Sequence, residues 1–540
     1  SRGARRARVG AARARAAAGG VTMKEIEALV EKLCRRGAEL DAVSYTVLIS
    51  AAERRGEVVA AVGWFEKMAK SGVGMRAQAV VALMKACAEG GEHEIVRAAW
   101  RDLKGAKGRR DMDVRAYSGA MMALGAIGDY KEALEALDDM RQGEANAPKP
   151  NLVCYTTAIS VCEQAGWWKR ALELLDQMIE AQVRPDVVAY NACISACKKT
   201  GQWKHALRLL SEMRANAVQP NVISYSTAIS ACEKDGRWTE ADRLMSSMSS
   251  HGVRPDTICY SAYISACASS KKSKEATEAL VKMRADGIPR NVYTLSACII
   301  ACARNADSDT ALKLLSEMPV KDGVKPNDVC YNAAISACAS DGRWKEGLGL
   351  LDVMSANRLK PSVVTYGSLI AACEKGGNWK KAIELLTLMK GDDLKPNAIT
   401  YISALSACAQ AGQVNQTLDL LKKMRIEKIE PNLACYTAVM TACNKAKDWR
   451  KAVEIMGDLR VRKIQPDLIA YSVCIATVAN GGQWETALLL LDEMERDGVK
   501  PDAAAYKQCI AACKKAGRPE AVQDLEDKLR RLPKEMSTRE

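Results

Sequence analysis

The sequence predicts an all-α protein, a right-handed superhelical solenoid of about 14 helix-turn-helix repeats of 35 residues. First, cysteines recur every 35 residues, with one extra residue midway: Cys162, Cys197, Cys232, Cys267, Cys302, then Cys338, Cys373, Cys408 and Cys443. Second, ten of the fifteen prolines stand at one phase of this period, each followed by Asp, Asn or Ser. Third, 540 residues exceed the roughly 250–300 that a single hydrophobic core supports.

Each repeat is predicted to be a pair of helices. In the repeat that starts at residue 222, Tyr225, Ile229 and Cys232 recur at helical spacing. Gly236 then supplies the left-handed residue that ends a helix, and Pro255 ends the second helix. One such pair cannot bury its apolar face alone, so neighbouring pairs must stack.

The period divides the chain as follows. Residues 1–20 form a basic tail rich in Arg and Ala, and residues 21–41 form a degenerate half-repeat that caps the N-terminal end of the repeats. Thirteen repeats fill residues 42–502, and residues 503–540 hold the last repeat and a charged capping helix. The thirteen repeats start at residues 42, 77, 114, 152, 187, 222, 257, 292, 328, 363, 398, 433 and 468.

Composition excludes several classes of protein. Hydrophobic residues at 48% and charged residues at 27% are typical of a folded soluble chain, and no apolar run is long enough for a membrane span. Three His argue against His-based metal sites or acid–base catalysis, so we expect neither metal nor cofactor. The 20 Cys include no CxxC pair, which indicates reduced thiols in an intracellular compartment. A net charge of +14 favours a polyanionic partner.

The repeat resembles that of the pentatricopeptide repeat family, in the pure 35-residue class. The match rests on Tyr at the fourth place, Gly at the fifteenth, Met near the end of the second helix and the closing Pro-Asx pair. Segments 225–234 (YSTAISACEK) and 382–389 (AIELLTLM) carry it, and it covers essentially residues 42–537. The tetratricopeptide repeat, with a 34-residue period and a different signature, fits poorly.

The resemblance implies single-stranded RNA binding, about one nucleotide per repeat, through the fifth residue of a repeat and its closing residue. Within this chain the fourth place stays Tyr in most repeats, whereas the fifth place varies among small, mostly polar residues, as a readout position should. Asp or Asn before a helix is also an ordinary N-cap, so capping alone is the alternative explanation of the closing residues.

Carried over pair by pair, the family's code implies one base for most repeats. The pairs are Ser118 with Asn151 (A), Thr156 with Asp186 (G), Asn191 with Asn221 (C or U), Ser226 with Asp256 (G), Ser261 with Asn291 (A), Ser296 with Asn327 (A), Asn332 with Ser362 (C), Gly367 with Asn397 (a weak A), Thr437 with Asp467 (G) and Ser472 with Asp502 (G). Ile402 with Asn432 reads no base, and Thr46 with Arg76 and Val81 with Asp113 lie outside the code. The implied RNA core is 5′-AGYGAACANGG-3′.

Two further sets of residues could contact RNA. Apolar residues at the second place lie three positions before the fifth, hence on the same helix face, and the resemblance implies that they sandwich the bases: Val153, Val188, Ile223, Ile258, Val329, Val364, Ile399 and Ile469. The alternative is that these second-place side chains pack in the core between repeats. Basic residues at the thirteenth place could reach phosphates or merely stabilise the helix dipole: Lys199, Lys234, Arg304, Lys375, Lys445 and Lys515. The Cys, Trp and Met stripes are expected to be core.

We expect no enzyme. A zinc deaminase would need His-x-Glu with a distal CxxC, and His93-Glu94 lacks both the spacing and the cysteines; nor is there room for a nuclease domain. The resemblance therefore implies a monomeric RNA-binding protein of organellar mRNA processing, stability or translation, with processing or editing proteins as further partners. The alternative is a helical scaffold for a protein partner. The basic, acid-free residues 1–20 favour a chloroplast, or else a mitochondrial, location, although they could equally be a disordered basic arm.

Overall fold

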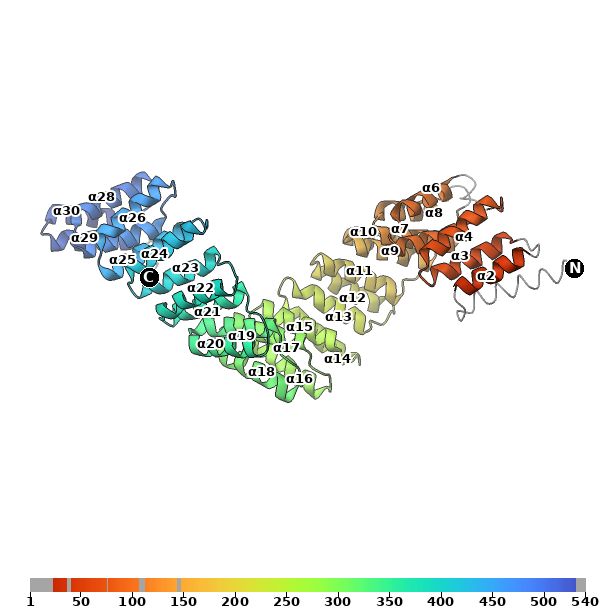
Figure 1. Cartoon of the computed structure of the whole chain (residues 1–540), viewed down its shortest axis with the longest axis horizontal. Coiled ribbons are helices and arrows are strands. Elements are labelled where there is room, and N and C mark those ends of the chain that lie inside the picture. Colours follow the sequence, from red (N-terminus) through yellow and green to blue (C-terminus); the bar gives the residue numbers. More distant parts are fainter. Residues whose placement is uncertain (1–22, 36–39, 75, 106–111, 143–146, 531–540) are drawn as a thin grey trace. The chain divides into compact units, whose positions relative to one another are not determined.

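The computed structural model describes residues 23–35, 40–74, 76–105, 112–142 and 147–530. All regular secondary structure in these ranges is helical, and the helices form consecutive antiparallel hairpins (Figure 1). The expected all-α solenoid of helix-turn-helix repeats is confirmed. The expected basic tail, residues 1–20, lies outside the described residues, as do parts of the two capping segments.

The first helices of the hairpins start at the residue after each closing residue. They are α3 (Ala42–Glu53), α5 (Ala77–Glu89), α7 (Val114–Ile127), α9 (Leu152–Ala165), α11 (Val187–Lys199), α13 (Val222–Glu233), α15 (Thr257–Ser269), α17 (Val292–Arg304), α19 (Asp328–Asp341), α21 (Val363–Lys375), α23 (Ala398–Gln410), α25 (Leu433–Ala446), α27 (Leu468–Asn480) and α29 (Ala503–Lys515). A further helix, α2 (Met23–Cys34), precedes them.

The second helices return antiparallel to the first. They are α4 (Val58–Lys70), α6 (His93–Lys104), α8 (Tyr130–Gln142), α10 (Trp168–Glu180), α12 (Trp203–Ala215), α14 (Trp238–Ser250), α16 (Ser273–Ala285), α18 (Ser308–Lys321), α20 (Trp344–Ala356), α22 (Trp379–Gly391), α24 (Val414–Ile426), α26 (Trp449–Val461), α28 (Trp484–Arg496) and α30 (Pro519–Arg530).

The turn inside each hairpin requires a residue with positive φ at the fifteenth place. Gly236 (φ 61°) and Gly342 (φ 70°) adopt this left-handed conformation without strain, because glycine has no Cβ. Lys271, Ala306 and Lys447 adopt the same conformation with φ of 57°, 56° and 58°. The repeated packing thus imposes the turn even where the local sequence disfavours it.

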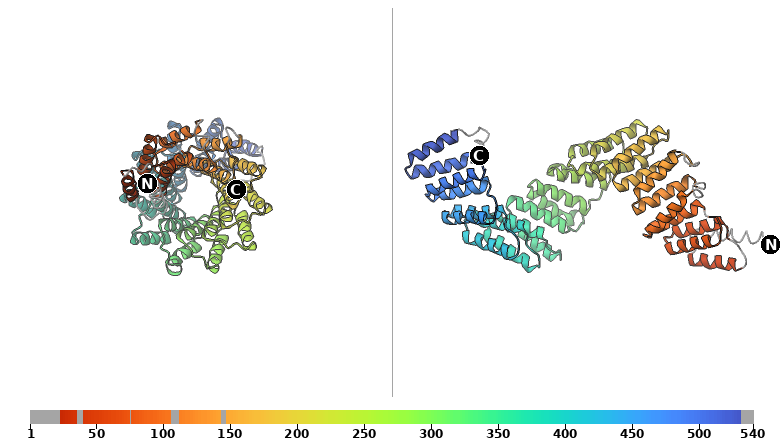
Figure 2. Two further views of the ribbon diagram at one scale, coloured as in Figure 1. Left: turned by 90° about the vertical axis from the view of Figure 1, so that its right-hand side faces the viewer. Right: turned by 90° about the horizontal axis from the view of Figure 1, so that it is seen from above.

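The chain divides into two compact units, residues 1–266 and 267–540. Within each unit successive hairpins lie side by side in chain order (Figures 1 and 2). In the second unit one buried cluster continues from Ile335 to Leu525, and it includes Tyr at the fourth place, Cys at the eleventh and Met at the end of the second helix, with Leu and Ala around them. The cores of neighbouring hairpins therefore merge, as a solenoid requires.

The expected core stripes are buried to different degrees. Cys232, Cys408 and Met248 are fully buried. The Trp stripe lies at the edge of the core: Trp203, Trp344 and Trp379 start second helices and keep part of their surface exposed, and Trp344 and Trp379 pack against the buried cluster. A cation covers several of these rings; Lys204 Nζ, for example, lies 5.6 Å from the Trp203 ring centroid.

Candidate nucleic-acid interface

The closing residues cap the first helices. Asp186 Oδ1 accepts a 2.9 Å hydrogen bond from the Ala189 backbone N–H, and Asn397 Oδ1 accepts one of 3.0 Å from Thr400. The same contact is absent at Arg76 and is made by the other closing residues: Asp113, Asn151, Asn221, Asp256, Asn291, Asn327, Ser362, Asn432, Asp467 and Asp502. A cap uses one side-chain oxygen, so the amide nitrogen of Asn and the second oxygen of Asp lie outside it.

Most hydroxyls at the fifth place are bonded within their own helix. Thr156 Oγ1 donates to the Leu152 carbonyl at 2.7 Å, and Ser296 Oγ donates to the Tyr293 carbonyl at 2.9 Å. The same local bond is made by Ser118, Ser226, Ser261 and Thr437. Because the hydroxyl proton is engaged, each of these oxygens presents acceptor lone pairs. Ser472 Oγ is buried and has no hydrogen-bond partner among the described residues.

The two asparagines at the fifth place are held from the next hairpin. Ser224 Oγ lies 2.6 Å from Asn191 Oδ1, and Asn191 Nδ2 lies 3.4 Å from Asn221 Oδ1. Thr365 Oγ1 lies 2.5 Å from Asn332 Oδ1. Sequence reasoning missed Ser224 and Thr365, because a hydroxyl at the third place of a helix signals only a capping box.

The apolar residues at the second place are exposed. Their side chains retain 42% (Val329) to 71% (Ile399) of their accessible surface, and the others lie between these values: Val153, Val188, Ile223, Ile258, Val364 and Ile469. The alternative that they form core between repeats is therefore wrong. Tyr293, at the same place in α17, is 57% exposed, and the sequence did not single it out because it interrupts the run of Val and Ile at this place.

One hollow of about 420 Å³ lies in the second unit. Residues at the second, fifth, thirteenth and closing places of neighbouring repeats line it. Val364 and Ile399 come from the second place of neighbouring hairpins, and Gly367 and Asn397 are the fifth residue and the closing residue between them. Lys375 completes the wall. Two exposed apolar side chains, an amide and a cation thus share one hollow whose fifth-place residue has no side chain.

The basic residues at the thirteenth place link neighbouring hairpins. Lys234 Nζ donates to the Lys199 carbonyl at 2.6 Å, and Lys445 Nζ donates to the Gln410 carbonyl at 2.7 Å. Lys199, Arg304 and Lys375 make the same kind of bond to the end of the preceding first helix. These cations stabilise the carbonyl end of a helix, and each ammonium keeps two further donors. Lys515 is exposed.

Glutamates at the twelfth place lie beside some of these cations. Burial raises the pKa of Glu233 and of Glu374, and hydrogen bonds from Ser265 and from Ser403 and Ser406 oppose the shift. In the first unit, Ser195 Oγ donates to Glu163 Oε1 at 2.7 Å from the next hairpin. These serines satisfy carboxylates that would otherwise face the same side of the helices unpaired.

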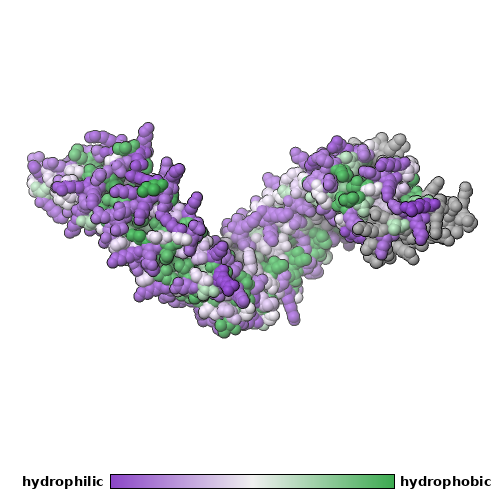
Figure 3. All heavy atoms as spheres, in the orientation of Figure 1, coloured by the Kyte–Doolittle hydropathy of each residue, from purple (hydrophilic) through white to green (hydrophobic). Residues whose placement is uncertain are grey.

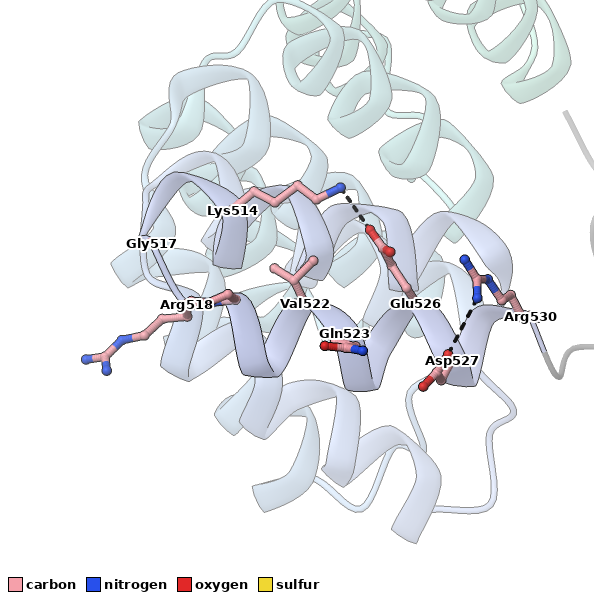
Figure 4. A pocket seen from close by; sticks show the side chains of 9 residues that line it. Lys514, Gly517, Arg518, Val522, Gln523, Glu526, Asp527 and Arg530 are labelled. Carbon is pink, nitrogen blue, oxygen red and sulfur yellow. Dashed lines mark hydrogen bonds and ion pairs between the residues drawn. The ribbon is translucent and has the colours of Figure 1, made fainter.

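Other places offer less to a ligand. The described residues hold no group of three or more His, Cys, Asp or Glu that could bind a metal ion. None of the described helices is long and apolar enough to cross a bilayer. A hollow of about 520 Å³ lies along α30, and four of its charged residues form two ion pairs: Lys514 Nζ lies 2.9 Å from Glu526, and Arg530 lies 3.8 Å from Asp527 (Figure 4). On the face drawn in Figure 3, apolar patches alternate with polar ones along the hairpins.

Sequence profiles of repeat families match most of the chain. The PPR repeat family matches residues 185–234, 222–269, 326–375 and 361–410, and the pentatricopeptide repeat domain matches 145–199 and 280–341. The PPR repeat matches 43–73, 115–143 and 258–288, and the pentacotripeptide-repeat region of PRORP matches 414–539. The chain belongs to the pentatricopeptide repeat family.

Similarity to individual proteins supports this family assignment for the pentatricopeptide repeat protein. The chloroplastic pentatricopeptide repeat-containing protein 10 of Zea mays is 32% identical over 165 residues, which are 30% of this chain and 20% of that relative. The match thus spans about a fifth of the relative's length. The crystal structure of PPR10 in complex with an 18-nt psaJ RNA element has a TM-score of 0.62 at 19% identity and covers 97% of this chain and 84% of that one.

The crystal structure of PPR10 from maize, at 22% identity, gives a TM-score of 0.54 and covers 97% of this chain and 78% of that one. Both structures have the same fold as this pentatricopeptide repeat protein.

Proposed function

We propose that this protein binds single-stranded RNA in a sequence-specific manner, one base per repeat. The observation that carries the proposal is the pair Asn191 and Asn221, a fifth and a closing residue whose side chains lie 3.4 Å apart and can meet one base edge together. Val188 and Ile223, both more than half exposed, flank that pair. The PPR10 relative was crystallised with RNA, which supports the same class of ligand here.

The capping bonds supply a chemical basis for the code. Asp186 caps through Oδ1, so Oδ2 remains as an acceptor for the N–H groups of guanine. Asn397 caps through its oxygen, so Nδ2 remains as a donor for the ring nitrogen of adenine. Capping and readout therefore use different atoms of one side chain, and the two explanations of the closing residues are compatible.

The proposed ligand follows the pairs in chain order. The pairs from Ser118/Asn151 to Ser226/Asp256 correspond to A-G-Y-G and lie in the first unit. Ser261 with Asn291 adds A, and the pairs from Ser296/Asn327 to Ser472/Asp502 add A-C-A-N-G-G. The basic residues at the thirteenth place would contact phosphates with their remaining donors.

Binding itself, without a chemical reaction, would change the fate of the transcript. A chain that occupies a transcript blocks exonucleases or RNA structure, which changes RNA processing, stability or translation without a chemical step. The chloroplastic relative favours an organelle as the place of action. A helical scaffold for a protein partner would expose aromatic anchors instead of the varied polar residues at the fifth place.

The test is a titration of the protein into labelled RNA of the eleven-base sequence, beside a shuffled RNA of equal composition, at about 0.15 M salt. At least about tenfold tighter binding to the proposed RNA supports the pair assignments. Equal binding to both RNAs would mean that the basic surface binds RNA without sequence specificity. Binding to neither RNA would shift the function to a protein partner.

Exchanging one pair tests the register. Asn332→Thr with Ser362→Asp should move the preference at one position from C to G. Asp caps a helix as well as Ser does, so the exchange should retain the cap of α21, and a thermal melt measures the cost of losing the contact between Thr365 and Asn332. A preference that stays at C would show that the register or the code is wrong.

A further inference from the structure

Hydroxyls at the third place contact the asparagines at the fifth place of the preceding hairpin. Ser224 and Thr365 are both fully buried. Ser224 Oγ lies 2.6 Å from Asn191 Oδ1 and 3.0 Å from Asn221 Oδ1, and Thr365 Oγ1 lies 2.5 Å from Asn332 Oδ1. A hydroxyl has one proton, and the shorter contact of Ser224 directs it to Asn191.

The sequence links these residue types throughout each unit. Both asparagines at the fifth place are followed, in the next repeat, by a hydroxyl residue at the third place. Ser or Thr at the fifth place is followed by Cys or Ala: Cys154 after Ser118, Ala189 after Thr156, Cys259 after Ser226, Cys330 after Ser296, Ala470 after Thr437 and Ala505 after Ser472. Ser261, followed by Thr294, departs from this rule.

The contacts fix which way each amide points. The backbone N–H of Ser224 holds Asn221 Oδ1 at 3.0 Å, and that oxygen faces Asn191 Nδ2 at 3.4 Å. Turning the Asn191 amide over would place its oxygen against Asn221 Oδ1 and break the shorter of the two Ser224 hydrogen bonds. The Asn191 oxygen is therefore engaged inside the protein, and one N–H of its amide remains for a ligand. Thr365 engages the oxygen of Asn332 in the same way.

We propose that Ser224 and Thr365 are positioning residues that turn the amides of Asn191 and Asn332 into obligate hydrogen-bond donors, and so make these two repeats select pyrimidines. The proposal rests on the proposed RNA binding. Both pyrimidines carry the O2 acceptor on the Watson–Crick edge, where guanine carries an amino donor and adenine only a C–H. A fixed donor therefore pairs with C and U and is left unpaired or repelled by purines.

The structure contains a matched control. Thr365 also forms a capping box, because it accepts a bond from the Ser362 backbone N–H at 2.9 Å. Thr400 forms the same box with Asn397 at 3.0 Å, but the fifth residue that it faces is Gly367, which has no amide to orient. Thr365→Val and Thr400→Val therefore lose the same cap, and Thr365→Val alone loses an amide contact.

The experiment measures the affinity of the full chain for four RNAs that differ only at the base assigned to Asn332. The wild type should prefer the pyrimidines over G by about tenfold or more. Thr365→Val should reduce that preference to about threefold or less, and Thr365→Ser should restore it. Thr400→Val should retain the wild-type preference. Circular dichroism melts of all variants would show whether each one folds.

Each outcome decides a different point. If wild type lacks a base preference at this position, the proposed pair readout fails, whatever the variants do. If wild type prefers pyrimidines and folded Thr365→Val keeps that preference, the positioning role is overturned and the readout stands. Equal losses in Thr365→Val and Thr400→Val would assign the effect to the capping box and also overturn the proposal.

Discussion

The phenol hydroxyl of Tyr401 donates a 2.8 Å hydrogen bond to Glu427 Oε2, which joins the start of α23 to the end of α24. Lys390 of the preceding hairpin donates to the phenol oxygen of Tyr401 at 3.1 Å. At the position of Glu427 in other hairpins, Asn216 and Asn357 instead donate to the phenol oxygens of Tyr190 and Tyr331, at 2.7 and 3.2 Å. The hydroxyl thus links both ends of a hairpin and its neighbour, and only Tyr can do this. The chain accordingly has 15 Tyr and one Phe.

We predict that Tyr401→Phe lowers the free energy of unfolding by about 1–2 kcal/mol, because Glu427 and Lys390 lose the hydroxyl of a buried partner. The measurement is the thermal midpoint, which should fall by a few °C. Tyr293→Phe serves as the control, since Tyr293 is 57% exposed and should lose almost nothing. Equal midpoints for the two variants would contradict the linking role of the Tyr401 hydroxyl.

A second prediction concerns the exposed apolar residues. Ile399→Ala should weaken binding of the proposed RNA by about fivefold, since roughly 1 kcal/mol of apolar contact with a base is lost. Ile426→Ala is the matched control: Ile426 is 78% exposed against 71% for Ile399, but it lies on α24 and does not line the hollow beside Gly367. Neither change should alter stability by more than about 0.5 kcal/mol. A similar loss of affinity in both variants would show that Ile399 does not pack against a base.

A third prediction separates two roles of Lys234. Its ammonium already donates to the Lys199 carbonyl at 2.6 Å, so a contribution to helix stability is expected whether or not RNA is bound. If its remaining donors also hold a phosphate, Lys234→Ala should make the slope of log affinity against log salt less negative by about 0.7, from near −4 for six contacts.

Lys204→Ala provides the comparison for this slope. Lys204 lies on α12 over the Trp203 ring, so its removal should leave the salt dependence unchanged. A slope that is the same in wild type and Lys234→Ala would restrict Lys234 to joining adjacent hairpins.

The sequence was sufficient for the features that depend on one hairpin. The period placed the first residue of each first helix, because a closing Asx caps the helix directly after it, as Asn151 and Asp186 do. Exposure of Val364 and Ile399 follows from their place beside the fifth residue on the helix face.

Features that depend on two hairpins could not be predicted. Ser224 and Asn191 are 33 positions apart, and their contact arises only when neighbouring first helices pack side by side. The bond from Lys375 to the Ser340 carbonyl has the same origin. The sequence did not show that the Trp stripe lies at the edge of the core, because a period identifies a recurring place in a repeat and does not distinguish the core from its edge, where Trp344 and Trp379 pack.

The last prediction concerns pH. Burial raises the pKa of Cys408 to about 11 and that of Cys232 to about 12, whereas a thiol in the unfolded chain ionises near 8.5. A raised pKa means that the folded state retains the proton and the unfolded state releases it. The stability that the buried, protonated thiols contribute is therefore complete below about pH 8.5 and is lost progressively up to about pH 11–12. In reducing buffer, the thermal midpoint should be flat from pH 7 to 8 and fall steeply by pH 10.

Two variants and one reagent test this mechanism. Cys408→Ala removes one buried thiol, so the midpoint should fall less steeply with pH, whereas Cys34→Ser removes an exposed thiol and should leave the pH profile unchanged. Because the thiolate is the reactive form, a disulfide reagent should modify Cys34 quickly in the folded chain and the other 19 cysteines only after denaturation. Rapid modification of several thiols in the folded chain, or a flat midpoint up to pH 10, would show that these cysteines are not held protonated by the core.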